Sequence, residues 1–560
     1  MNTAWRALVE RELAGRSFED VLVTRLREGI DVQPLYTGPL SQDVAGYPGA
    51  PPFVRGSRES DATWRRTPRY RAEEIDAIAV DLAAGTDGVW LEGPIDFDRA
   101  LKMVVPAATL IAHEGDGHAL LDHLGDRSAP YLVLGLDPLG MRAAHGTPAD
   151  LGALPRLLER VTSIGRTSAR TALVSTVPHH RAGADAAIEL GIALATAAEY
   201  LRVMGVDAAA RFAFVFSIGN DVFLEIAKLR AARWAWAKML TACGVSSPPP
   251  MWIHAETSRR TLSRIDPWTN MLRVTNSTFA AAVGGADSIA AACFDEAIGI
   301  PDALGRRVAR NTSIVLAEES HLGNVVDPAG GSYYVEALTH ALARSGWREL
   351  QEIEAAGGMA SALESGAIAA RIAVSWKRRA AAIATRKAPI TGVSEYAMID
   401  EPPIERPRWD DAAPGLLPAL RDAEGFEALR AGALAVGPIY LANLGPRAEH
   451  AAREGFARGF FGAGGLRTIS DPGTAAGGVD VLADRFASSG AHVACLCGTD
   501  ARYALEAAAE ARALRARGAK QVYLAGRGAG IEGLDGTIQK GIDVIATLTV
   551  LISSMKGGAA

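Results

Sequence analysis

The chain has 560 residues, which is too long for one ordinary hydrophobic core and predicts two or more domains. Its hydrophobic content of 49% and charged content of 22% are typical of a globular enzyme-like protein. A net charge of −6 spread over this length argues against nucleic acid or an anionic membrane as the main partner. No apolar run approaches the length of a membrane-spanning helix, so we expect no membrane contact.

Residues 1–50 are predicted to form a helical arm followed by an extended strap. The first part, MNTAWRALVERELAGRSFEDVL, is amphipathic and lacks the apolar stretch of a signal peptide. Repeated X-Pro steps in PLYTGPLSQDVAGYPGAPPFVRG disfavour helix. This strap either wraps a partner chain or packs on its own domain. The four cysteines are expected to be reduced and structural, which favours a cytoplasmic protein.

Residues 51–385 alternate apolar strand candidates with amphipathic helices such as 184–204 and 222–244. The predicted strands are 88–93, 108–113, 131–137, 172–177, 212–219, 252–258 and 288–294. This α/β alternation predicts a closed (β/α)8 TIM barrel, whose mouth is lined by side chains at the carboxyl ends of the strands. The candidate mouth residues are His179, His180, Asn220, His254, Glu256 and Asp295.

A second α/β domain is predicted at residues 431–560, after a Pro-rich linker at 386–430. Its predicted strands are 433–443, 466–470, 492–497, 521–526 and 543–551, with helices near 447–461, 476–489 and 500–518. Five parallel strands in this length indicate a flavodoxin-like, doubly wound sheet. Ligands of such sheets bind beyond the strand carboxyl ends, which directs attention to the first strand and its turn, GPIYLANLGPRAEHAAREGF.

Several segments resemble the cobalamin-dependent acyl-CoA mutases. They are YPGAPPFVRG (47–56), AGADAAIELG (182–191), EIAKLRAARWAW (225–236), DPWTNMLRVT (266–275), FDEAIGIPDALGRRVARNT (294–312) and EESHLGNVVDPAGGSYYVEALT (318–339). The resemblance covers essentially the whole chain and has the same layout of barrel, linker and flavodoxin-like domain. It is closest to methylmalonyl-CoA mutase, and there to the small (beta) subunits of the heterodimeric enzymes.

The cobalamin-binding loop of the family departs from its pattern in this chain. The family carries Asp-x-His-x-x-Gly after the first strand, where the histidine binds cobalt and the aspartate orients its ring. By the resemblance these positions hold Asn443, Gly445 and Ala448, so no imidazole stands at the ligand position. His450 lies five residues further on and is expected to be a solvated surface histidine. We therefore expect neither cobalamin nor a metal to be bound by this chain.

Two further turns of this domain differ from the family. The serine-containing turn after the third strand reads Cys497-Gly498-Thr499-Asp500. The small-residue turn after the fourth strand reads AGRGAG (525–530), where Arg527 is expected to intrude on the nucleotide groove.

The barrel departs from the family as well. The family's RQYAGFS segment is missing, and Tyr70 is the only tyrosine in the corresponding region. The family's YHMQEAG reads PHHRAG, which places Pro178 and Arg181 in the histidine and glutamate columns. A shifted loop could still present the imidazole of His179 or His180. The family's HCQTSG reads HAETSR, and the new charges Glu256 and Arg259 would need partners. No catalytic residue is expected in this chain.

The resemblance therefore implies a non-catalytic beta subunit of heterodimeric methylmalonyl-CoA mutase. Its expected partner is the catalytic alpha (large) subunit, which interconverts (R)-methylmalonyl-CoA and succinyl-CoA with adenosylcobalamin; a GTPase chaperone of the mutase is a further possible partner. The N-terminal arm and the linker are the candidate contact segments. One alternative is an active mutase for another acyl-CoA, with cobalamin bound without a histidine or supplied by a separate domain. The other is a non-catalytic scaffold that binds acyl-CoA or a GTPase chaperone.

Overall fold

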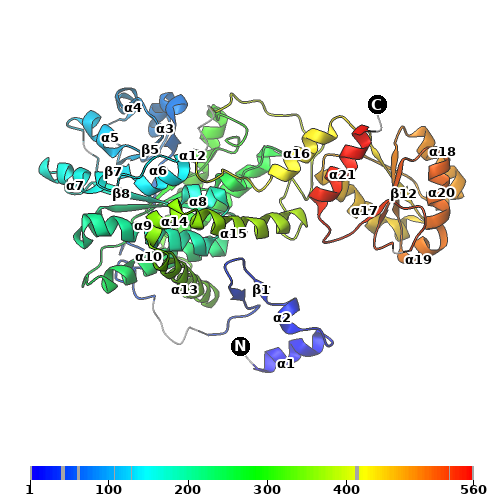
Figure 1. Cartoon of the computed structure of the whole chain (residues 1–560), viewed down its shortest axis with the longest axis horizontal. Helices are drawn as coiled ribbons and strands as arrows, with labels where there is room; N and C mark the ends of the chain where they lie inside the picture. Colours follow the sequence, from blue (N-terminus) through cyan, green and yellow to red (C-terminus); the bar gives the residue numbers. More distant parts are fainter. Residues whose placement is uncertain are drawn as a thin grey trace. The chain divides into compact units, whose positions relative to one another are not determined.

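The computed structural model describes residues 3–38, 45–59, 63–105, 108–127, 129–409, 415–528 and 530–557. The chain forms two compact units (Figure 1). Unit 1 consists of residues 1–262, 270–376 and 405–421, and unit 2 of residues 263–269, 377–404 and 422–560. The segment predicted as a linker is thus divided between the two units, and the helix α16 (Glu424–Ala433) begins inside it.

Unit 1 contains all seven strands predicted for the barrel, and adjacent strands are parallel. They are β5 (Gly88–Glu92), β6 (Leu110–Glu114), β7 (Tyr131–Leu136), β8 (Arg170–Ser175), β9 (Phe212–Ile218), β10 (Ile253–Thr257) and β11 (Ser288–Ala290). Their burial explains the prediction, since strands covered on both faces read as continuous apolar runs.

An eighth strand, absent from the prediction, closes this sheet into a barrel. Residues 65–70 form β3 (Arg65–Arg66) and β4 (Arg69–Tyr70), interrupted at Pro68. β3 pairs with β11 at one edge of the sheet and β4 pairs with β5 at the other. One short chain segment therefore joins both edges, and the predicted TIM barrel is confirmed.

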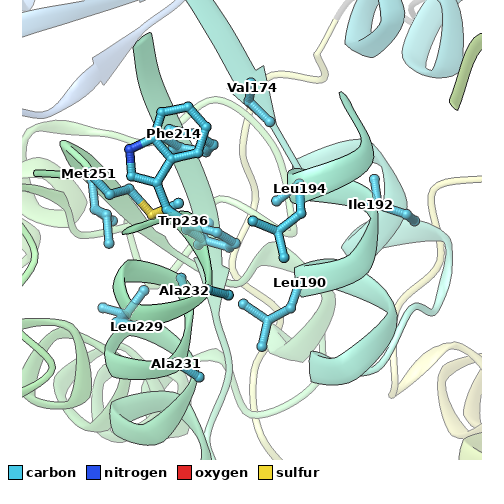
Figure 2. Packing of buried hydrophobic residues seen from close by; sticks show 14 of the residues in the cluster. Val174, Leu190, Ile192, Leu194, Phe214, Leu229, Ala231, Ala232, Trp236 and Met251 are labelled. Atoms are coloured by element: carbon cyan, nitrogen blue, oxygen red, sulfur yellow. The ribbon is translucent and has the colours of Figure 1, made fainter. Parts of the chain in front are cut away.

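Helices cover the outside of the barrel. They are α3 (Ile78–Ala83), α4 (Phe97–Met103), α5 (Gly117–Leu124), α6 (Pro138–His145), α7 (Ala153–Ser163), α8 (Val177–Ala182), α9 (Ala186–Met204), α10 (Val222–Ala242), α11 (Asn270–Val283), α12 (Ala303–Glu318), α13 (Tyr333–Ala355), α14 (Gly358–Glu364) and α15 (Ala367–Ala384). Figure 2 shows how α9 and α10 pack on the strands: Trp236 of α10 meets Phe214 of β9 with ring centroids 5.0 Å apart. This interface is part of the largest hydrophobic cluster.

The N-terminal segment packs in part on its own unit. It forms α1 (Thr3–Glu12), α2 (Phe18–Val21) and a hairpin of β1 (Thr24–Arg25) and β2 (Asp31–Val32). The hairpin turn is anchored by Glu28, whose carbonyl accepts a hydrogen bond of 3.1 Å from Ser345 of α13. The helix α1 buries none of its residues. Residues 39–44 of the predicted strap lie outside the described residues.

Unit 2 contains a five-stranded parallel sheet in the order β13-β12-β14-β15-β16. Its strands are β12 (Ile439–Asn443), β13 (Thr468–Ser470), β14 (Val493–Cys497), β15 (Gln521–Ala525) and β16 (Gly536–Ile538). The helices α18 (Gly478–Ser488) and α20 (Ala508–Ala516) pack on one face, while α16, α17 (Arg447–Ala463) and α21 (Val544–Gly557) pack on the other (Figure 1). A short helix, α19 (Asp500–Arg502), precedes α20. This is the predicted doubly wound order.

One predicted strand of this sheet is wrong. Residues 544–551 belong to α21, and the fifth strand is the three-residue β16. The side chain of Asp543 accepts a hydrogen bond from the backbone N–H of Ala546 at 2.8 Å, as a helix N-cap does. Val544, Leu548 and Leu551 then pack on the sheet, so tertiary burial overrides the β-branched composition of the run. Within the described ranges, no helix of either unit has the length and apolarity needed to cross a membrane.

Candidate functional site

A network of buried ion pairs fills the mouth of the barrel. Glu256 of β10 forms an ion pair with Arg69 of β4 and accepts a hydrogen bond of 3.0 Å from Ser217 of β9. Arg69 also lies 2.8 Å from Glu92, at the carboxyl end of β5. Arg259 follows β10 and contacts Glu92 at 3.1 Å. Glu256 and Arg259 thus find their partners in Arg69 and Glu92 across the strand ends.

The electrostatics of this network favour its charged form. Burial alone would raise the pKa of Glu92, but Arg259, Arg69 and Arg71 outweigh it and hold that pKa well below its usual range. Burial likewise opposes the charge of Arg259, and Glu296 and Glu92 outweigh it and raise the pKa of the guanidinium. Glu92 and Arg259 are thus kept ionised by their neighbours, as a structural ion-pair network requires.

A small cavity borders this network. Its volume is about 50 Å³, and its lining includes Arg69, Glu256 and Arg259. Pockets for small organic ligands are much larger, roughly 300–1,000 Å³.

The histidines of α8 belong to a second buried polar cluster. The Nδ1 atom of His180 lies 2.6 Å from Glu189, and its Nε2 atom lies 2.7 Å from the hydroxyl of Ser258. Lys228 contacts the same Glu189 carboxylate at 3.4 Å. The order serine–histidine–carboxylate resembles a catalytic triad. However, Ser258 is 1% exposed and Lys228 shares the carboxylate, so the arrangement ties β10, α8, α9 and α10 together and offers no accessible nucleophile.

The loop after β12 in unit 2 has a backbone conformation suited to glycine. Gly445 has φ of 74°, and its N–H donates a hydrogen bond of 2.7 Å to Thr474. A Cβ atom at this position would lie 2.7 Å from the Nε atom of Arg502. Arg502 is held there by Glu449, with Nε 2.5 Å from the carboxylate. Any larger side chain at position 445 would meet both strain and a steric clash.

The neighbouring strand ends in unit 2 are closed by two side chains. The hydroxyl of Tyr503 donates a hydrogen bond of 2.7 Å to the carbonyl of Ala525 and accepts one of 2.9 Å from the N–H of Gly498. Arg453 of α17 also donates to the Ala525 carbonyl. A Cβ atom at Gly526 would overlap the Arg453 guanidinium. The space between the ends of β14 and β15 is therefore filled by protein atoms.

Comparison with known proteins places this geometry in a family. The family model described as methylmalonyl-CoA mutase matches residues 162–415. The chain is 41% identical to a methylmalonyl-CoA mutase small subunit of Streptomyces virginiae, over 98% of this chain and 96% of the relative. It is 37% identical to the small subunit of Propionibacterium freudenreichii subsp. shermanii, over 93% and 88%. The chain belongs to the methylmalonyl-CoA mutase family.

Similarity to a large subunit of this family is lower. The methylmalonyl-CoA mutase large subunit of Streptomyces virginiae is 31% identical, over 73% of this chain and 64% of that subunit. The small subunit of the same organism matches nearly the full chain. The chain is therefore similar to the small subunits of the mutase family over its whole length.

In this member of the mutase family, His450 is not the surface histidine that was predicted. Its side chain is 3% exposed. The Nδ1 atom lies 3.5 Å from the carboxylate of Glu454, and a Cβ atom at Gly473 would lie 3.4 Å from Nε2. The prediction failed because the first turns of α17 pack against the loop around Gly473, which the local helical pattern does not reveal.

The positions around His450 have separate roles. Asn443 is buried and donates a hydrogen bond of 2.6 Å to the carbonyl of Asp471. Ala448 is exposed on α17. Arg527, expected to intrude on the groove, is also exposed, and the intruding guanidinium is that of Arg453. Ala529 of the same turn lies outside the described residues.

The remaining barrel residues named from the sequence are mostly structural. His254 stacks on Trp90 inside the barrel at a centroid distance of 3.8 Å, and burial lowers its pKa well below the usual range. His179 is buried, and burial lowers its pKa to about 4. The hydroxyl of Tyr70 donates to Asp81 at 3.1 Å, so this tyrosine is held on the outside of the strand.

Two other predicted mouth residues also contact protein groups. Asn220 accepts a hydrogen bond of 3.3 Å from the hydroxyl of Ser277. Asp295 accepts one of 2.6 Å from Arg406 and is fully buried. Pro178 lies in the first turn of α8. Burial, with the charge of Arg259 nearby, lowers the pKa of Arg181 to about 10.

Two arginines that fill space in the candidate sites were not predicted from the sequence: Arg69 in the barrel mouth and Arg453 near the ends of β14 and β15. Arg69 lies in an unrecognised strand, and Arg453 lies on a helix whose contacts are formed only in the folded sheet. A signal for Arg69 was present: the new acid Glu256 demands a buried cation elsewhere in the barrel. No comparable signal in the sequence points to Arg453.

Proposed function

We propose that this chain is the non-catalytic small (beta) subunit of a heterodimeric methylmalonyl-CoA mutase. Its partner is a large (alpha) subunit that interconverts (R)-methylmalonyl-CoA and succinyl-CoA with adenosylcobalamin. The names of the full-length relatives support a small subunit, and a large subunit with a related sequence exists in Streptomyces virginiae. The small subunit stabilises the large one by association.

The filled barrel mouth carries the non-catalytic part of the proposal. Arg69, Glu256 and Arg259 form ion pairs where a substrate of this barrel fold would bind, and a cavity that borders these residues has a volume of about 50 Å³. Admitting an acyl thioester would require buried ion pairs to separate, and separated buried charges are strongly unfavourable. At this mouth the carboxylates of Glu92 and Glu256 are paired with arginines.

We further infer that unit 2 does not bind cobalamin. A cobalt ligand in this fold would come from the loop after β12, but Gly445 has no side chain and Arg502 covers it. His450 cannot replace it without leaving its buried position on α17. Arg453 and Tyr503 fill the space between β14 and β15 that a nucleotide tail would enter. The residues present do not fit the cofactor.

Co-expression with the large subunit tests the proposed partnership. The two chains should co-purify in equal amounts, and the large subunit should lose activity faster on heating when purified without this chain. A large subunit that neither co-purifies with this chain nor changes its half-life in its presence would overturn the proposal.

A further inference from the structure

A groove with basic and aromatic walls runs along the outside of the barrel. Its first part is a cavity of about 540 Å³ between α10, α13 and the hairpin turn at 29–31. Its second part, of about 450 Å³, also contains Trp234 and Lys238 and is bordered by Pro51, Pro52 and Pro248. Because the two parts share Trp234 and Lys238, they form one continuous surface, which we call the α10–α13 groove.

The first part of the groove is strongly cationic. Lys238, Arg344 and Arg348 are exposed and line it, while Asp31 is the one carboxylate of its lining. Lys238 lies over the ring of Trp347 at 5.0 Å, and Arg348 donates to Ser345 at 3.5 Å. Within the described ranges, none of the three cations lies at ion-pair distance from a carboxylate. Their charge is therefore available to an external anion.

The aromatic residues of the groove are not needed for the core of the barrel. On α10, Trp236 is fully buried against Phe214, whereas Trp234 is half-buried and lines the groove. Two residues correspond to about 200° of rotation around a helix, so these tryptophans lie on nearly opposite faces. The indole of Trp234 packs at 5.2 Å from the ring of His340, which leaves part of it open. Half-buried tryptophans beside arginines are frequent anchors of protein–protein interfaces.

The second part of the groove has a different character. Its lining is mainly proline, alanine and small polar residues, and Lys238 is the one charged residue among them. An occupant that fills both parts thus needs an anionic portion and an apolar portion along one extended shape. A single mononucleotide concentrates its charge in one phosphate group and would leave the second part empty.

We propose that the α10–α13 groove docks an acidic, partly apolar polypeptide segment of the large subunit. Carboxylates of this segment pair with Lys238, Arg344 and Arg348, and its apolar side chains contact Trp234 and the prolines. The argument for this occupant is charge complementarity combined with the length of the groove. The inference rests on the proposed function, since it names the surface through which the two subunits associate.

Charge reversal in the intact chain tests the inference. The double variant Lys238→Glu/Arg344→Glu is compared with Arg307→Glu, an exposed arginine of α12 outside the groove. Affinity for the large subunit is measured at 50 and 300 mM salt, and circular dichroism and thermal melting establish that each variant is folded. The double variant should bind at least 100-fold more weakly at low salt and lose the salt dependence of the wild type, while Arg307→Glu changes the affinity less than threefold.

The outcomes separate this inference from the proposed function. If the wild-type chain binds the large subunit and the folded double variant binds it equally well, the groove inference is overturned and the subunit proposal stands. If the wild-type chain does not bind the large subunit, both fail. A calorimetric titration with coenzyme A is run in parallel. If coenzyme A binds saturably, and the double variant abolishes this binding without losing affinity for the large subunit, the groove is a nucleotide site. That result would overturn the proposal of a polypeptide occupant.

Discussion

The carboxylate of Glu256 in β10 and the guanidinium of Arg69 in β4 form an ion pair across the mouth of the barrel. β11 lies between their strands in the sheet, so the contact is made through the interior and not between paired neighbours. Glu256 departs from the family's HCQTSG motif, and Arg69 belongs to RRTPRY, a strand with arginines on both sides of a proline. Together they fill part of the barrel mouth with protein atoms.

The variant Arg69→Met tests the energetic role of this pair. It removes the cation from Glu256 and Glu92 while keeping an apolar stem, and we expect it to lower the free energy of unfolding by about 3–5 kcal/mol. Urea denaturation measures the loss, with the exposed Arg307→Met as a control expected within about 0.5 kcal/mol of the wild type. Adding Glu256→Leu should recover part of the loss. A loss below about 1 kcal/mol would show that the pair is not structurally important.

Restoring the family's histidine at position 445 should not restore a cofactor site. Gly445→His places a side chain at φ of 74° and against Arg502, so we expect a destabilisation of about 1–3 kcal/mol. Thermal melting and the visible spectrum after incubation with adenosylcobalamin are the measurements. The double variant Gly445→Ala/Arg502→Ala removes the clash but keeps the backbone strain at position 445. It should therefore recover only the part of the lost stability that is due to the contact with Arg502. A Gly445→His protein of wild-type stability that binds cobalamin would contradict the geometry of this loop.

The burial of His450 predicts a stability effect that a surface histidine would not have. His450→Ala should destabilise unit 2 by about 1–3 kcal/mol, because it leaves a cavity beneath the loop around Gly473. The exposed His492→Ala provides the matched control in the same unit. Hydrogen exchange of α17 localises the effect. If α17 is equally protected from hydrogen exchange in both variants, His450 is not buried as the structure shows.

Glu510 predicts a defined dependence of stability on pH. Burial, with Asp471 and Glu506 nearby, raises its pKa to about 8. The unfolded chain ionises this group near about 4.3, so the folded state retains a proton that the unfolded state loses. The contribution of Glu510 to the stability of the wild type therefore falls as pH rises from about 4 to about 8.

The variant Glu510→Gln does not titrate and should escape this loss. Its Tm relative to the wild type should rise by about 2 °C or more between pH 5 and pH 8, as measured by calorimetry. The variant Glu532→Gln, at an exposed position, should show the same difference in Tm from the wild type at both pH values. A Glu510→Gln difference that does not change with pH would mean that Glu510 is ionised in the folded protein.

Most of the fold could be predicted from the sequence because buried strands carry their own signal. Seven barrel strands read as apolar runs, but the eighth, RRTPRY, reads as a polar loop. Its pairing depends on β11 and β5 at either side, which is a tertiary effect. The prediction of a strand at 543–551 was wrong for the opposite reason. The β-branched residues of this run suit a strand, but the N-cap Asp543 and the tertiary contacts of the run stabilise a helix.

For the candidate site, the sequence predicts from a local motif that no cobalt ligand stands at Gly445, and this stays a prediction. The sequence does not reveal which side chains contact this loop. The groups that fill the vacated space come from distant segments: Arg502 lies 53 residues from its partner Glu449, and Arg453 lies 72 residues from Ala525. Contacts at such separations exist only once the sheet has folded. A comparison of motifs therefore finds the change at Gly445 and does not find the arginines that contact these loops.

The most direct test of the account is a single comparison of mutase turnover with and without the large subunit. This chain, purified alone and supplied with adenosylcobalamin and (R)-methylmalonyl-CoA, should produce no succinyl-CoA and should leave the cobalamin spectrum unchanged. The complex with the large subunit should turn over and bind one cobalamin per pair. Stoichiometric cobalamin binding and turnover by the isolated chain would contradict the claim that its barrel mouth and its β12 loop are closed to chemistry.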